Sequence, residues 1–279
     1  MAGDVLVSCL MVTLPTPARF AFLKRSIAAY CAQTHTPREL VMVLDLGPAE
    51  AKTAIRMHVA SLGRDDIRVV EAPGELSLGA LRNLSRASAR GQVHCQWDDD
   101  DLHHPQRVDR QLAALTASGA QAVCLQEVML FLTASRELYW TNWRAAPPTV
   151  MPATVMCLAT VPVRYPETGP TSRLGEDTAV ALQFLSLGAL HALTDAPHLF
   201  VYVGHAANTW GGDFHPMLAS RLGLSQGLLL RREARIRESL RAIDFGPGTV
   251  TVRGPNGAAF TLDVDPQGGP RRSTSMNSR

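Results

Sequence analysis

The fold and the site are decided by one stretch, Val93-His94-Cys95-Gln96-Trp97-Asp98-Asp99-Asp100-Asp101-Leu102. In it, a short apolar segment with strand propensity ends in four consecutive carboxylates, and a helical pattern led by Pro105 follows. Adjacent negative charges repel, so a folded chain keeps them together only where a cation, a helix N-terminus or solvent compensates them. Oxygen ligands at alternate positions suit Mg²⁺ or Mn²⁺, ions that often arrive bound to a diphosphate. The stretch therefore predicts a metal-assisted phosphate site at a strand end.

A simpler interpretation is an acidic loop that caps the next helix. Asp is favoured at helix starts, and His104-Pro105 would supply the N-cap and the first helical position. Short acidic motifs also occur by chance, so the stretch alone leaves both interpretations open.

The composition predicts an ordinary globular protein. The chain has 279 residues, 46% hydrophobic and 19% charged, which is enough for one large domain or two small ones. Its net charge of +2 gives no electrostatic case for a nucleic-acid partner, which usually needs a clustered basic face. The spacing of the basic residues between positions 231 and 241 predicts a solvated helix face, with contact to a membrane surface or an acidic partner as the alternative.

Cysteine usage and the absence of long apolar stretches predict a cytoplasmic location. The five cysteines form no Cys-x-x-Cys pair, which is typical of reduced core residues: they are Cys9, Cys31, Cys95, Cys124 and Cys157. Apolar residues 5–14 have no basic segment or cleavage site beside them, so we expect a buried strand there rather than a signal peptide. No stretch approaches the length of a transmembrane segment, and peripheral membrane contact is left open.

Strand and helix patterns alternate along the first 90 residues. Continuous apolar runs at residues 5–13, 40–45 and 67–71 are typical of strands covered on both faces by helices. Helical spacing over residues 22–33, 49–62 and 78–90 connects them. This order predicts a mostly parallel α/β sheet with its ligand beyond the carboxyl ends of the strands. Because neither Gly-x-Gly-x-x-Gly nor Gly-Lys-Ser/Thr is present, phosphate binding would have to work through a metal.

The second half of the chain has weaker patterns. After a helix over residues 105–118, strand-like runs lie at residues 122–133, 153–163 and 199–203, with helical spacing at 178–187 and at 216–243. Residues 249–253 and 259–264 alternate as a hairpin, and the polar residues 268–279 are expected to be disordered.

Three functional features here have ordinary structural explanations as well. The aromatic cluster with Trp140 and Trp143 is more often packing, although a stacking platform for a sugar ring is the alternative. The Glu176-Asp177 pair at a helix start usually compensates the helix dipole. A single loop histidine such as His205 is most often a surface residue.

Taken together, these stretches resemble family 2 glycosyltransferases of the GT-A fold. The resemblance covers roughly residues 5–213 and rests on an ordered set of short motifs: Thr13 with Arg19, Ala32-Gln33-Thr34, Asp45, Gly79 with Arg82-Asn83, Trp97-Asp98-Asp99-Asp100-Asp101 with Pro105, Tyr165-Pro166-Glu167, Gly175-Glu176-Asp177, and Asn208-Thr209-Trp210. The chain departs from the family at Asp45-Leu46-Gly47-Pro48, where Asp-Asp-Gly-Ser is common, and at Leu14-Pro15-Thr16-Pro17, where Tyr-Asn is usual. These departures leave the identity of the nucleotide open.

The resemblance implies a mixed, mostly parallel sheet flanked by helices. Residues 1–104 would form the nucleotide-binding half and residues 105–213 the acceptor-side half of one GT-A domain. Helices and a hairpin at residues 214–267 would follow it.

The resemblance also implies transfer from a nucleotide-sugar donor, such as a UDP-sugar, with inversion and with Mn²⁺ or Mg²⁺ as cofactor. Asp98 would face the ribose, Asp100 would ligate the metal, His205 would be a late metal or diphosphate contact, and Asp177, beside Glu176, would be the general base. The other implied residues are Thr13, Arg19, Asp45, Arg82 and Asp99 for the donor, and Trp140, Trp143 and Trp210 for a sugar, lipid-linked or peptide acceptor.

Two other functions remain as alternatives. A nucleotidyltransferase would also use a metal and carboxylates, but it should carry a Gly-rich basic loop near its first strand. A non-catalytic sugar- or nucleotide-binding domain would keep the fold, although it would have no need for both Asp100 and Asp177.

Overall fold

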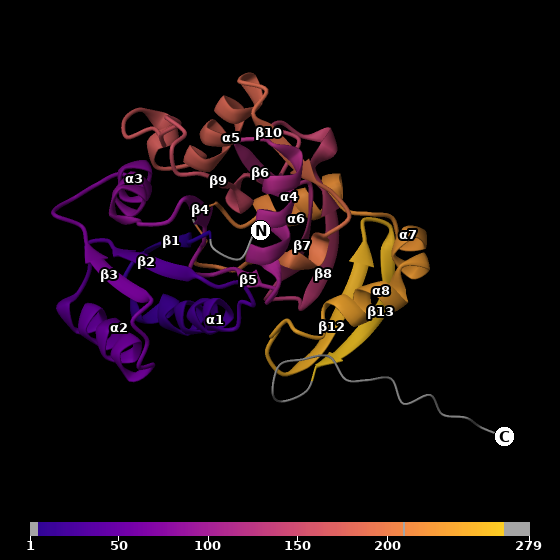
Figure 1. The fold of residues 1–279 in the computed structure, drawn as a ribbon. Coiled ribbons are helices and arrows are strands. Elements are labelled where there is room, and N and C mark those ends of the chain that lie inside the picture. Colours follow the sequence, from indigo (N-terminus) through magenta and orange to yellow (C-terminus); the bar gives the residue numbers. More distant parts are fainter. Residues whose placement is uncertain (1–4, 209, 265–279) are drawn as a thin grey trace.

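The computed structural model describes residues 5–208 and 210–264, and two β-sheets form the framework of this part (Figure 1). The first sheet has the strand order β10-β6-β9-β4-β1-β2-β3, and the second has the order β13-β12-β8-β7-β11-β5. The strands of the first sheet are β1 (Val7–Thr13), β2 (Arg38–Leu44), β3 (Ile67–Glu71), β4 (Val93–Gln96), β6 (Ala122–Leu125), β9 (Met156–Leu158) and β10 (Leu190–Leu193). Those of the second are β5 (Leu102–His103), β7 (Glu127–Leu132), β8 (Glu137–Asn142), β11 (Phe200–Gly204), β12 (Gly248–Gly254) and β13 (Gly257–Val264).

Helices cover both faces of the first sheet, as the continuous apolar strands predict. They are α1 (Phe20–Cys31), α2 (Ala49–Ser61), α3 (Leu78–Ser88), α4 (Arg107–Ser118) and α5 (Glu176–Ser186). Met42 of β2 belongs to the core formed with α1 and α2, whereas its neighbour Val43 packs with Leu81 of α3. Successive strand residues thus face opposite helix layers. The predicted mostly parallel α/β sheet is confirmed, because within this sheet β9 alone runs antiparallel to its neighbours.

The strand order creates a crevice beside β1. β1 pairs in parallel with β2 on one side and with β4 on the other. The strand order therefore reverses at β1: β2 and β3 lie on one side of it, and β4 and the later strands of this sheet lie on the other. In open α/β sheets, ligands bind at such a switch point, outside the carboxyl ends of the strands. The acidic stretch that follows β4 lies at this end.

Several local predictions for the middle of the chain are wrong. Residues 122–133 are not one strand, since Gln126 separates β6 of the first sheet from β7 of the second. The run at residues 153–163 contains only the short antiparallel β9, and β10 was not foreseen. Helix α4 begins at Arg107 and not at Pro105, with Gln106 as its N-cap and no capping side chain. The acidic stretch therefore does not cap this helix.

The C-terminal hairpin, predicted correctly from its alternation, extends the second sheet. β12 pairs in parallel with β8 and in antiparallel with β13. Three short helices precede it in place of the expected one or two: α6 (Phe214–Leu222), α7 (Gln226–Arg231) and α8 (Glu233–Ser239). Leu229, Ile236 and Val252 share one hydrophobic core with Trp140 of β8, which ties this segment to the rest of the molecule. The tail at residues 268–279 lies outside the described residues.

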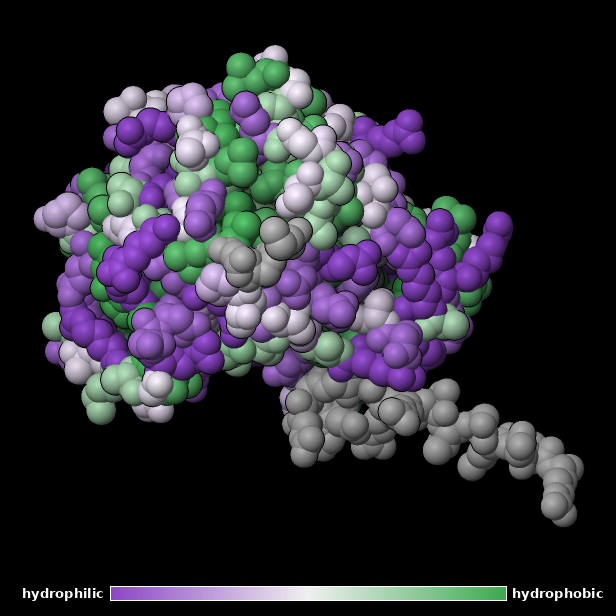
Figure 2. All heavy atoms as spheres, viewed as in Figure 1, coloured by the Kyte–Doolittle hydropathy of each residue, from purple (hydrophilic) through white to green (hydrophobic). Residues whose placement is uncertain are grey.

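Hydrophilic and hydrophobic residues are interspersed over the face of the molecule seen in Figure 2. Within the described residues, no helix is both long and apolar enough to cross a membrane. Four of the five cysteines are buried, and Cys31 is partly exposed. All five thiols are free, as expected of core residues.

Candidate active site

A pocket of about 590 Å³ opens at the carboxyl ends of β1, β2 and β4. Its walls come from several parts of the chain that are far apart in sequence. They include Leu14, Thr16 and Arg19 after β1, Asp45 after β2, Leu78, Leu81 and Arg82 of α3, Asp98 to Asp101 after β4, Arg173 to Asp177 at the start of α5, and Tyr202, Ala207, Asn208 and Trp210 at and after β11. Most of the site residues predicted from the sequence therefore line this pocket.

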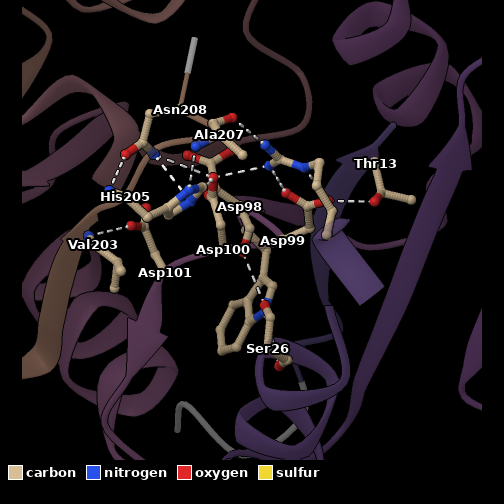
Figure 3. Close-up of polar contacts among 12 residues, drawn as sticks. Thr13, Ser26, Asp98, Asp99, Asp100, Asp101, Val203, His205, Ala207 and Asn208 are labelled. Carbon is tan, nitrogen blue, oxygen red and sulfur yellow. Dashed lines mark hydrogen bonds and ion pairs between the residues drawn. The ribbon is translucent and has the colours of Figure 1, made fainter. Parts of the chain in front are cut away.

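The outer two of the four aspartates are held by different parts of the fold, and Figure 3 shows the contact of Asp101 with Val203. Asp98 accepts a hydrogen bond from Nη1 of Arg82 at 2.9 Å. Asp101 is buried and accepts the backbone N–H of Val203 at 2.8 Å, which joins the acidic stretch to β11. Burial, together with the charges of Asp100 and Asp98, raises the pKa of Asp101. Both aspartates line the pocket, but Asp101 also joins the acidic stretch to β11.

The inner two aspartates share one arginine. Arg19 forms ion pairs with both Asp99 and Asp100, and Thr13 also donates a hydrogen bond to Asp99. Burial and the charge of Asp100 raise the pKa of Asp99 to about 6, although Arg19 and Thr13 act in the opposite direction. Thr13, which the resemblance implies for the nucleobase pocket, is buried and is absent from the pocket wall. Its hydroxyl orients Asp99 instead.

Asp100 contacts three residues through a single oxygen atom. Its Oδ2 atom is 2.9 Å from Nη2 of Arg19, 3.0 Å from Nε2 of His205 and 3.4 Å from Nδ2 of Asn208. Burial raises the pKa of Asp100, but the hydrogen bond from His205 and the charge of Arg19 outweigh it, so the pKa lies below its ordinary value. This carboxylate is ionised at neutral pH and able to bind a cation.

Asp100 and His205 fit a divalent metal as a pair of ligands. Two neighbouring ligands of an octahedral ion, each at about 2.1 Å, lie about 3.0 Å apart, and Asp100 Oδ2 and His205 Nε2 are 3.0 Å apart. Phe22 stacks on the imidazole of His205, with the ring centroids 4.2 Å apart, and so fixes its orientation. Among the described residues, no three His, Cys, Asp or Glu side chains come close enough to form a complete site. Other ligands would have to come from a diphosphate and water, as is usual for Mg²⁺.

Arg82 connects the acidic stretch to the start of α5. Besides its contact to Asp98, Arg82 donates through Nε to Oε1 of Glu176 at 2.7 Å. Helix α3 lies close to the 165–167 segment, since a Cβ on Gly79 would stand 1.9 Å from the Pro166 carbonyl oxygen. The next residue of the helix motif, Asn83, donates to the Tyr165 carbonyl at 2.9 Å. Three motifs that are far apart in sequence thus hold Arg82 in place.

Asp177 lies half-buried on the pocket wall in the first turn of α5. Its Oδ1 atom accepts the backbone N–H of Thr178 at 2.6 Å. Burial and the charge of Glu176 raise its pKa to about 7, while Arg82 acts in the opposite direction. A carboxylate with this pKa is suited to accept a proton near neutral pH.

The three tryptophans predicted to contact the acceptor differ in their exposure to solvent. Trp140 and Trp143 are 1% and 9% exposed and pack in two hydrophobic cores, so the prediction that they stack on an acceptor is wrong. Trp210 is 36% exposed at the pocket wall and stacks on Phe214. Thr209 of the same motif lies outside the described residues.

Two residues of the site, Tyr202 and Asn208, have no role that the sequence patterns indicated. Tyr202 of β11 lines the pocket, and burial together with the charges of Asp101 and Asp177 raises its pKa. A tyrosine in an otherwise apolar strand, three residues before His205, is the signal that could have indicated it. Asn208 Oδ1 accepts the backbone N–H of His205 at 2.5 Å, which positions the histidine loop.

The chain is similar to known glycosyltransferases in sequence and in structure. Residues 11–137 match the family model described as glycosyl transferase family 2, which covers β1 to the start of β8 and ends before α5. No curated protein matches the chain.

Solved structures with similar folds include TarS of S. aureus, residues 1–349, in complex with UDP, with a TM-score of 0.55 and 12% identity over 85% of this chain and 79% of that chain. TarS in complex with UDP-GlcNAc matches with a TM-score of 0.53 and 14% identity over 84% of this chain and 66% of that chain. The mannosyltransferase PcManGT from Pyrobaculum calidifontis, in complex with GDP-Man and Mn²⁺, has a TM-score of 0.53 and 13% identity over 84% of this chain and 62% of that chain. Residues 11–137 thus resemble glycosyl transferase family 2, and the chain has the GT-A fold.

Proposed function

We propose that the protein transfers a sugar from a nucleoside-diphosphate sugar to an acceptor hydroxyl with inversion at the anomeric carbon. The observation that carries the proposal is the double contact of Arg82, which joins Asp98 on the donor side to Glu176 beside Asp177. Through Arg82, a carboxylate able to contact the donor and a carboxylate able to accept a proton belong to one pocket. An enzyme needs both for this reaction, whereas a protein that only binds nucleotides needs the first alone.

The chemical role of each residue follows from its charge state. The acceptor oxygen bonds to the anomeric carbon, the bond from that carbon to the phosphate oxygen breaks, and the diphosphate leaves with the electron pair. Asp177 takes the acceptor proton, because a hydroxyl has too high a pKa to attack as an alkoxide by itself. Asp100 and His205 would hold a divalent cation, which when bound offsets the negative charge that develops on the departing diphosphate.

The donor would lie along the β1, β2 and β4 side of the pocket. Asp45 and Asp98 line that side, and Arg82 lies between Asp98 and α5. The fold neighbours hold UDP, UDP-GlcNAc or GDP-Man, which supports a nucleoside-diphosphate sugar as the class of donor. We take a UDP-sugar as the first candidate, with GDP-mannose as the comparison. The acceptor would approach from the side of Asp177, Tyr202 and Trp210.

The test is a titration of UDP and GDP with Mn²⁺ or with EDTA, followed by donor hydrolysis and transfer assays on the corresponding sugars. We expect one nucleotide to bind tightly with Mn²⁺ and weakly in EDTA, and its sugar conjugate to be cleaved with inversion. Unchanged affinity in EDTA would contradict the metal role of Asp100. Tight binding without turnover of any donor, with or without sugar acceptors, would support the non-catalytic alternative.

A further inference from the structure

Arg19 occupies a central position among the acidic groups of the pocket. It follows two prolines after β1 and lies at the start of α1. Its Nη2 atom reaches Asp100 at 2.9 Å as well as Asp99, and its Nη1 atom donates to the carbonyl of Ala207 at 3.0 Å. The side chain is only 16% exposed. One guanidinium thus joins the end of β1, the acidic stretch and the loop after β11.

Arg19 binds the same oxygen that a metal would need. Oδ2 of Asp100 accepts from Arg19 and from His205, so the two strongest donors to this atom are the resident guanidinium and the second candidate metal ligand. A carboxylate oxygen offers about two lone-pair directions. A cation bound between Asp100 and His205 would take the position of the His205 hydrogen bond, and its positive charge would repel the guanidinium that holds the other position.

Displacing Arg19 is unfavourable unless another anion receives it. The guanidinium lies in a largely buried site, where the loss of one of its two carboxylate partners is costly. Its second carboxylate, Asp99, would keep it nearby after it leaves Asp100. A diphosphate bound beside the cation would supply new oxygens for the planar fork of an arginine.

We infer that Arg19 is an exchangeable counter-charge that makes cation binding depend on the nucleotide diphosphate. In the free protein Arg19 neutralises Asp100; when the cation and the diphosphate enter together, Arg19 moves from Asp100 to the diphosphate. The inference rests on the proposed function, since it assumes that Asp100 and His205 hold the cation. Cation and nucleotide then bind with positive coupling, and each raises the affinity of the other by the same factor.

The incomplete ligand set supports the same coupling. The described residues supply a pair of ligands rather than three or more, so a cation alone would gain few protein contacts for the loss of the Arg19 pair. A metal site that is both incomplete and already neutralised should remain empty until the diphosphate arrives.

The experiment measures Mn²⁺ binding, by titration calorimetry and by the electron spin resonance signal of free Mn²⁺, with and without UDP or GDP. The variants are Arg19→Met, which removes the charge at similar length, and Arg144→Met as a matched control at an exposed arginine far along the chain. For the wild type and for Arg144→Met, we expect the nucleotide to tighten Mn²⁺ binding by about 10- to 100-fold. For Arg19→Met, we expect Mn²⁺ alone to bind at least tenfold more tightly and the coupling factor to fall towards one.

The outcomes separate this inference from the function it rests on. If Arg19→Met has a native melting curve but binds Mn²⁺ alone no more tightly than the wild type, the inference is wrong while the metal role stands. If the wild type binds no Mn²⁺ even with nucleotide, the metal role itself fails. If Arg19→Met does not fold, Arg19→Lys decides, because a lysine keeps the charge but loses the fork. Its coupling factor should be lower than that of the wild type, and an unchanged factor would overturn the inference.

Discussion

Asp100 and Asp177 line the same pocket, yet their surroundings move their pKa values in opposite directions. Asp100 is met by Arg19, His205 and Asn208, and its pKa lies below the ordinary value despite burial. Asp177 is subject to burial and to the charge of Glu176, and its pKa is raised to about 7. Two carboxylates whose pKa values are driven apart in one site commonly divide the chemistry between them. Here one is suited to hold a cation and the other to exchange a proton.

The difference comes from where the nearest arginine side chains bind. Arg19 contacts Asp100 directly, whereas Arg82 contacts Glu176 and reaches Asp177 only through its longer-range charge. Asp177 is also at the start of α5, where the helix dipole favours an ionised carboxylate. Burial and the neighbouring Glu176 outweigh that effect. The acidic pair is thus arranged so that one member binds the arginine and the other stays basic.

The largest effect should follow from Asp177→Asn, which removes the proton acceptor with almost no change of shape. We expect turnover to fall on the order of 10²-fold or more, because general base catalysis is lost. Nucleotide affinity in the presence of Mn²⁺ should change little. Steady-state transfer assays and calorimetry measure the two quantities, with Asp65→Asn as control at an exposed, distant aspartate. Near-normal turnover would make Asp177 a structural residue and require another base.

Asp100→Asn should have the complementary effect, on binding. We expect UDP affinity in Mn²⁺ to fall on the order of 10- to 100-fold, because a metal site loses its charged ligand. Affinity in EDTA should stay at the wild-type value measured in EDTA. The same titration on Asp177→Asn and Asp65→Asn provides the comparison. If Asp100→Asn and Asp177→Asn weaken binding equally, the division of roles between the two carboxylates is wrong.

Phe22→Leu should have the smallest effect, and it acts on His205, the other proposed ligand of the cation. Phe22 stacks on His205, and losing an aromatic pair of this kind should lower the Mn²⁺ affinity measured with nucleotide about three- to tenfold. Phe22→Tyr should retain wild-type affinity, because it keeps the ring. Phe260→Leu, in the C-terminal hairpin, controls for the loss of a phenyl group elsewhere. An equal loss in Phe22→Tyr and Phe22→Leu would argue against stacking as the cause.

The first half of the fold could be predicted from the sequence because its signals are local. The apolar runs of β1 and β2, and the helical spacing between them, depend on residues that are near neighbours in the chain. The acidic residues at the strand ends followed from the same patterns. By contrast, the break at Gln126 was invisible, because an apolar run has the same pattern whether it serves one sheet or two.

Partners of the site residues could not be predicted, since each pair joins distant segments. Thr13 meets Asp99 across 86 positions and Arg19 meets Asp100 across 81, so no spacing rule applies to them. Several residues named by the resemblance, such as Asp45, Arg82 and Asp98, line one pocket, but the resemblance could not show that Thr13 is buried outside its wall. Likewise, no local sequence pattern could indicate that Trp140 is buried in a core shared with the C-terminal hairpin.

The most direct test of the account is the pH dependence of turnover, measured beside the pH dependence of nucleotide binding with Mn²⁺. Asp177 accepts a proton only in its ionised form, and its pKa is raised to about 7. Turnover at saturating donor should therefore be full above this pH and fall about tenfold per unit below it. Nucleotide binding should persist to lower pH, because the pKa of Asp100 lies below its ordinary value. If turnover and binding instead fall together, or if turnover stays constant from about pH 5.5 to 8, the two carboxylates do not have the separate roles assigned to them.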